Sequence, residues 1–151
     1  MQHLAACVAH GEPFLGHFKV EKGNVLVVDE ENRKRQIRER YEAMDVPTTS
    51  GVLFLSETGL KIDNEDDMDE LLKIAEIVRP TLIILDSFVR LHSGEENSAT
   101  EMAAVFSALK RLVSDDRAVI FIHHHRKHQP GQGHGGRSAG VNIRGSSDIL
   151  A

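Results

Sequence analysis

The sequence has little of what cross-linked, secreted or membrane proteins use. It contains one cysteine, Cys7, which excludes an internal disulfide and suits a reducing cytoplasm. No run of about 18 apolar residues occurs, so we expect no transmembrane helix. The first ten residues also lack the charged start and long apolar middle of a signal peptide. We therefore expect a cytoplasmic protein that has no membrane segment.

An excess of positive charge is also missing. Eighteen Lys and Arg stand against 23 Asp and Glu, which gives a formal net charge of −5. This balance excludes a protein coated with basic residues for nucleic acid, although it leaves room for a local basic patch. The 151 residues, 40% of them apolar, suffice for one domain with a buried core.

Along the chain, short continuous apolar runs alternate with segments whose apolar residues recur every three to four positions. β-branched and aliphatic runs predict strands over residues 24–28, 52–55, 81–85 and 118–122. Apolar stripes predict helices over residues 1–9, 32–44, 65–78 and 99–112. Asn64 is expected to cap the third helix, and Ser98 with Glu101 to form a capping box before the fourth. The alternation predicts a three-layer α/β fold, in which helices cover both faces of a mostly parallel sheet.

Residues 126–145 differ in composition from the rest. They hold six of the 12 glycines and no acidic residue. Their cations are Arg126, Lys127, Arg137 and Arg144. We expect a flexible basic loop, which serves either as a plain surface linker or as a segment that orders on the phosphates of nucleic acid. It has no aromatic residue, so base stacking by this loop is not expected.

Titratable or polar residues follow every predicted strand. The four apolar runs lead into Asp29-Glu30-Glu31, Ser56-Glu57, Asp86-Ser87 and His123-His124-His125. Ligands of open parallel sheets bind beyond the carboxyl ends of the strands, so these residues are the candidates for chemistry.

Each candidate has more than one interpretation. Asp86 could hold Mg²⁺ beside phosphate oxygens, or simply cap a turn. Glu30 or Glu31 could activate a water molecule, or belong to a solvated acidic turn. His124 could hydrogen-bond a γ-phosphate, or be an ordinary histidine. A metal-dependent hydrolase that uses Asp29, Asp86 and the histidines is a further alternative, although the histidine spacing matches no defined zinc motif.

Five segments, taken together, resemble the RecA-fold ATPases, and specifically the RepA-like hexameric helicase branch. They are VLVVDEEN (25–32), TLIILDS (81–87), RLHSGEEN (90–97), FIHHHRK (121–127) and IRGSS (143–147). The resemblance covers almost the whole chain. It implies ATP and Mg²⁺ as cofactors, a hexameric ring, and action on DNA, with single-stranded DNA as the expected form. It also implies that the segments after Asp86 and His124 face a central channel, with Arg126, Lys127 and Arg137 toward DNA.

The resemblance also implies roles for single residues. Glu31 matches the catalytic glutamate, with Glu30 as the second choice. Asp86 matches the Walker B aspartate that serves Mg²⁺, and Ser87 follows it as the family's serine does. The residues expected at the nucleotide are the γ-phosphate sensor His124, its neighbour His123, and Arg144 acting across a subunit interface.

One large departure from the family is the missing P-loop. No G-x-x-x-x-G-K-[ST] occurs in the sequence, and that motif supplies backbone N–H groups and a lysine to the phosphates. We therefore expect residues 1–151 to be a single partial RecA-like domain that lacks the P-loop strand and the last strands. We also expect a gap in the sheet where the P-loop strand would lie. The alternative is a P-loop-less module for DNA binding or assembly.

Overall fold

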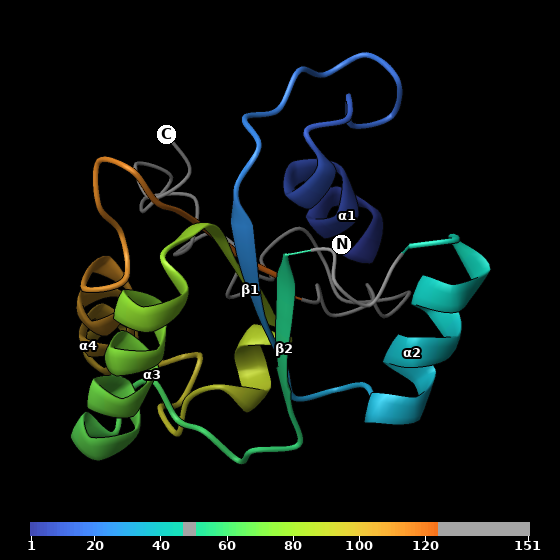
Figure 1. The fold of residues 1–151 in the computed structure, drawn as a ribbon. Helices are drawn as coiled ribbons and strands as arrows, with labels where there is room; N and C mark the ends of the chain where they lie inside the picture. The colour runs from blue at the N-terminus through green and yellow to red at the C-terminus, as the bar shows by residue number, and fades with distance from the viewer. Residues whose placement is uncertain (47–50, 124–151) are drawn as a thin grey trace, which may run out of the picture.

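The computed structural model describes residues 1–46 and 51–123, which form a four-stranded sheet with helices on both faces (Figure 1). The strands are β1 (Asn24–Asp29), β2 (Val52–Ser56), β3 (Pro80–Asp86) and β4 (Ala118–Phe121). All neighbours are parallel, in the order β2-β1-β3-β4. The predicted parallel α/β architecture is confirmed. The expected gap is wrong, because these four strands pair consecutively through their backbones and the missing motif interrupts none of the pairings.

In the part of the chain that the structure describes, two helices cover each face of the sheet. On one face lie α1 (Gln2–His10) and α2 (Lys34–Ala43), and on the other lie α3 (Glu65–Val78) and α4 (Ala99–Lys110) (Figure 1). A short 3₁₀ helix, η1 (Phe88–Arg90), follows β3 directly. Within residues 1–46 and 51–123, no helix is long and apolar enough to cross a membrane.

The central strand β1 is buried on both faces. Leu26 and Val28 pack into the large core under α3 and α4, whereas Val25 and Val27 pack against α1. Side chains of a strand alternate between faces, so a continuous apolar run is what a strand needs when helices cover both sides.

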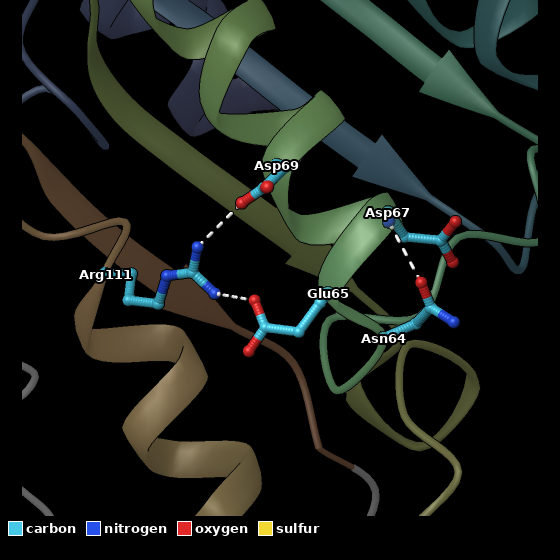
Figure 2. Close-up of polar contacts among 5 residues, drawn as sticks. All are labelled: Asn64, Glu65, Asp67, Asp69 and Arg111. Atoms are coloured by element: carbon cyan, nitrogen blue, oxygen red, sulfur yellow. Dashed lines mark hydrogen bonds and ion pairs between the residues drawn. The ribbon is translucent and has the colours of Figure 1, made fainter.

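The residues that flank helix α3 cap its start and end it. The Asn64 side chain accepts a hydrogen bond from the Asp67 N–H at 3.1 Å, which confirms the predicted cap (Figure 2). At the other end Arg79 takes the left-handed conformation, with φ of 47°, and Pro80 then begins β3. Figure 2 also shows the Arg111 guanidinium reaching across from the end of α4 to Glu65 at 2.7 Å and Asp69 at 2.8 Å.

The predicted capping box of α4 forms only in part. The Ser98 hydroxyl accepts from the Glu101 N–H at 3.4 Å, as expected. The Glu101 carboxylate, however, accepts from the Glu95 N–H at 2.7 Å. The Ser98 N–H is already satisfied by the Glu95 carbonyl at 2.8 Å, so the glutamate is not needed there.

Candidate active site at the carboxyl edge of the sheet

The strand register brings the polar strand ends to one level. Asp29 is paired with Ser56 of β2 on one side and with Asp86 of β3 on the other. In the next strand, Leu85 is paired with Phe121, so His123 emerges just beyond β4. Because all four strands are parallel, the residues that follow them meet at one edge, which is where ligands of open α/β sheets bind.

Asp29 is a structural residue of the turn after β1. It is buried, and its Oδ1 accepts from the Glu31 N–H at 3.0 Å and the Asn32 N–H at 2.7 Å. The Asn32 side-chain amide donates to both carboxylate oxygens, at 3.2 and 3.0 Å. Bonds of this kind from an Asp to the backbone two and three residues on fix a tight turn. Asp29 therefore sets the position of the Glu31 backbone.

The metal-dependent hydrolase that we considered from the sequence gains no support from this geometry. Asp29, one of its expected ligands, has both oxygens engaged within its own turn. In residues 1–46 and 51–123, no group of three or more His, Cys, Asp or Glu side chains is arranged to hold a metal ion.

The two candidate bases, Glu30 and Glu31, have different surroundings. The Glu30 carboxylate accepts from the Thr58 N–H at 2.9 Å, from the Thr58 hydroxyl, and from the Gly59 N–H at 3.1 Å. Glu30 thereby ties the turn after β1 to the turn after β2. Glu31 is exposed at the same edge, and its backbone is fixed by Asp29. Sequence reasoning missed Thr58, because nothing local signals a partner 28 residues away.

Asp86 and Ser87 lie at the end of β3. The Asp86 backbone carbonyl accepts from the Glu30 N–H at 2.6 Å, so this bond joins the residues that follow two adjacent strands. The Asp86 side chain is partly exposed. Ser87 is buried, and its carbonyl accepts from the Arg90 N–H at 3.0 Å to begin η1. The peptide bond between Asp86 and Ser87 is cis.

His123 is held between an acid and an aromatic ring. Its Nδ1 lies 3.6 Å from Glu96 Oε1, and its ring packs edge-on to Phe88 at a centroid distance of 6.0 Å. The Phe88 N–H donates to the Ile122 carbonyl at 2.7 Å. The segment after β3 is therefore attached to the end of β4 by backbone and side chains together. Glu96 was missed from the sequence, since the RLHSGEEN motif does not reveal which of its acids turns toward the sheet.

A second histidine, His92, lies in the same segment. It is buried, and its ring stacks obliquely on Phe88 at 4.7 Å. Burial lowers the pKa of His92, while the nearby carboxylates of Asp63 and Glu96 act in the opposite direction. The imidazole is therefore neutral at physiological pH and acts as a packing element beneath the edge.

Several expected site residues cannot be placed. Residues 47–50 and 124–151 lie outside the described part of the chain. Three predictions therefore have no structural outcome. They are the role of His124 as phosphate sensor, the basic loop over residues 126–145 with Arg126, Lys127 and Arg137, and the action of Arg144 across a subunit interface.

Comparison with known families identifies the family of the chain. The sequence profile of the AAA domain matches residues 1–130, which is most of the chain. The chain belongs to the AAA domain family. No curated protein gives a significant match. AAA domains of this family are P-loop NTPases with a RecA-like fold, so the expected kinship with RecA-fold ATPases is confirmed at that level.

Members of the AAA family typically bind ATP with Mg²⁺. The Asp86 carboxylate, partly exposed at the carboxyl end of a central strand, is the oxygen ligand type that Mg²⁺ prefers. Glu31 lies beyond the adjacent strand at the same edge. The phosphate-binding P-loop motif does not occur among the 151 residues of this AAA domain.

Proposed function

We propose that this AAA domain is the central portion of an ATP-hydrolysing motor that acts on DNA, of the RepA-like helicase type. The observation that carries the proposal is the meeting of Glu31, Asp86 and His123 beyond three neighbouring parallel strands. Phosphoryl transfer needs a group that orients water, a ligand for Mg²⁺ and a contact to the γ-phosphate, and this edge offers one candidate for each.

Glu31 is the proposed general base. It accepts a proton from the water that attacks the γ-phosphate, which requires an accessible carboxylate on a fixed backbone. Glu31 meets both needs, since it is exposed and its N–H is held by Asp29. Glu30 is less suited to the role, because its oxygens accept three hydrogen bonds from Thr58 and Gly59. We assign Glu30 to positioning.

The remaining roles follow the resemblance. Bound Mg²⁺, held by Asp86 with Ser87 following it, would neutralise charge on the phosphate oxygens. His124, with His123 beside it, would hydrogen-bond the γ-phosphate, and Arg144 would act across a subunit interface. We further propose a hexameric ring, in which Arg126, Lys127 and Arg137 contact DNA.

The test of the base is Glu31→Gln in the protein expressed from its full reading frame. We expect ATP hydrolysis to fall by about 10²–10⁴-fold, because a general base contributes about that much. Binding of a fluorescent ATP analogue should be retained, because the amide keeps the size of the side chain. Asp86→Asn should instead remove the Mg²⁺ dependence of nucleotide binding.

Two controls separate the base from its surroundings. Glu42→Gln removes an exposed carboxylate of α2, away from the strand ends, and should leave hydrolysis unchanged. Glu30→Gln should lower hydrolysis less than Glu31→Gln does. If Glu31→Gln costs only a few-fold while Glu30→Gln abolishes turnover, the assignment of the two glutamates is wrong.

The second candidate function is a P-loop-less module that binds DNA or assembles with a true ATPase. The missing G-x-x-x-x-G-K-[ST] favours it, since that motif supplies most contacts to the phosphates. The discriminating measurement is DNA binding with and without ATP. Salt-sensitive binding that ignores nucleotide, together with no measurable ATP affinity, would favour this module over the motor.

A further inference from the structure

Helix α2 is a strongly basic element in an acidic protein. Residues 33–43 contain five cations and two carboxylates, a net charge of +3, so the remaining residues carry −8. The cations are Arg33, Lys34, Arg35, Arg38 and Arg40, and all five side chains are exposed. In the sequence, these residues are distinct from the basic segment over residues 126–145. We call these five residues the α2 basic surface.

Among residues 1–46 and 51–123, most cations of the α2 basic surface have no acidic partner. Arg35 pairs with Glu39 at 2.9 Å, one turn along the helix. In the described part of the chain, Arg33, Lys34, Arg38 and Arg40 make no ion pair. Arg111 of the α3–α4 side, by contrast, contacts two carboxylates. Four unpaired cations so close together attract anions strongly from solution.

The placement of these cations does not stabilise the helix. The first turn of α2 contains no acid, while Lys34 and Arg35 lie there, at the end where the helix dipole favours negative charge. Lys34 and Arg38 are four residues apart, so their like charges repel along one row. A sequence that breaks local rules in this way is expected where a functional site offsets the cost.

Packing turns the α2 basic surface outward. Ile37 and Tyr41, four residues apart, are the buried residues of α2 and pack with Ala6 of α1 and with β2. This anchored row fixes the orientation of the helix at one flank of the sheet (Figure 1). Lys34 and Arg38 then form a row beside it, with their Cβ atoms about 5–6 Å apart.

The chemistry of the surface selects among anionic partners. Four of the five cations are arginines, whose planar guanidinium groups bind phosphate oxygens with two parallel hydrogen bonds. A membrane is disfavoured, because both large apolar side chains of α2, Ile37 and Tyr41, are buried and none is left to insert. The acidic α3 offers a second copy fewer open carboxylates than its six acids suggest, because Glu65 and Asp69 are paired with Arg111 and Asp67 accepts from the Lys61 N–H.

We propose that the α2 basic surface binds the phosphodiester backbone of a nucleic acid. The choice of DNA as the polymer rests on the proposed function. Binding is independent of base sequence, because α2 exposes no aromatic side chain that could stack on a base. DNA therefore contacts this domain at a helix on the flank of the sheet (Figure 1).

The experiment measures binding of a fluorescein-labelled oligo(dT) of about 30 nucleotides to the 151-residue chain by anisotropy, without nucleotide, over a range of salt. The helix variant is Lys34→Gln/Arg38→Gln/Arg40→Gln. We expect its affinity to fall by about tenfold or more at low salt, and the salt slope to become shallower by about 2. The matched control, Lys19→Gln/Lys73→Gln/Lys110→Gln, removes the same charge from other exposed sites and should bind nearly as wild type does.

A third variant, Arg126→Gln/Lys127→Gln/Arg137→Gln, keeps the two proposals distinguishable. If the helix variant binds as wild type while this loop variant fails, the inference about α2 is overturned and the proposed loop contact survives. If the helix variant alone fails, the inference holds and the loop assignment is contradicted. If the matched control loses as much affinity as the helix variant, the loss comes from net charge alone, and the proposal that α2 binds DNA is overturned.

Two further outcomes also overturn the inference. One is wild type that binds phosphatidylserine vesicles but no DNA. The other is wild type that self-associates in a salt-sensitive way, binds no DNA, and becomes monomeric in the helix variant. Circular dichroism of each variant confirms that the fold is retained. The test of the nucleotide site by Glu31→Gln is unaffected by any of these results.

Discussion

Helices α2 and α3 lie on opposite faces of one sheet and carry opposite charge. The 14 residues of α3 contain six acids and one lysine, whereas residues 33–43 carry +3. In α3 the charges follow the rules of helix stability, because three acids occupy the first turn and Asn64 caps it (Figure 2). In α2 the first turn is basic. The Arg33 side chain makes no cap hydrogen bond, and the Gln36 side chain instead accepts from the Arg33 N–H at 3.1 Å. The charge of α3 stabilises its own helix, whereas the charge of α2 does not, which is why we propose a nucleic-acid contact for α2.

The two helices also differ in how deeply they are buried, and α3 is again the more firmly held. Met68, Leu71 and Ala75 of α3 are fully buried in the large core shared with α4. Ile37 and Tyr41 of α2 belong to a small cluster beside α1 and β2. Helix α3 is therefore held by its core and its caps, while α2 is held mainly by one short row. The difference predicts how each helix responds to substitution.

The largest expected effect on stability comes from truncating a buried side chain of α3 or of α2. Met68→Ala should destabilise the protein by about 2–5 kcal/mol, because it leaves a cavity in a core that cannot collapse freely. Ile37→Ala should cost about 2 kcal/mol, at the lower end of that range, because its cluster is smaller and nearer to solvent. Urea unfolding monitored by circular dichroism measures both. Equal losses would mean that α2 is anchored as firmly as α3.

A smaller effect is expected at the helix starts. Asn64→Ala should cost about 1 kcal/mol, because it leaves the Asp67 N–H without its acceptor. Arg33→Ala is the matched change at α2, and it should alter stability by less than about 0.5 kcal/mol, because the Arg33 side chain makes no cap. Thermal unfolding of both variants at one pH tests the contrast, and a larger loss at Arg33 would contradict it.

The smallest effect should have the opposite sign. Lys34→Gln/Arg38→Gln removes a like-charge pair four residues apart, and should raise stability by about 0.2–0.5 kcal/mol at low salt. The gain should vanish at about 1 M salt, where such charges are screened. The control Lys73→Gln in acidic α3 should not stabilise. If the double variant is instead less stable at low salt, the cations of α2 support the fold.

Much of the fold was predictable from local pattern. Each strand and helix was expected within a few residues of its observed bounds, because a buried parallel strand needs a continuous apolar run and a surface helix needs a stripe. The cap at Asn64 is equally local and is confirmed. The gap expected in the sheet was wrong, because strand order depends on how the layers pack and not on the order along the chain.

The candidate site was predictable as a set of strand ends but not as an arrangement. Asp29, Glu30 and Glu31 are equivalent acids in sequence. The structure separates them into a turn-forming residue, a residue that holds the next loop, and an exposed carboxylate. Their roles in catalysis stay predictions. The basic character of α2 was visible as a charged helix, but its outward direction depends on which row packs against β2.

The sequence by itself determined where strands and helices form, which residues end each strand, and how charge is distributed along the chain. These properties depend on neighbours within a few positions. Only the tertiary structure decided that β1 lies between β2 and β3. That order brings Glu30 to Thr58, 28 residues away, and joins the Glu30 N–H to the Asp86 carbonyl. Such contacts form only when distant segments pack side by side, because the free energy that places them comes from burying both faces of the sheet.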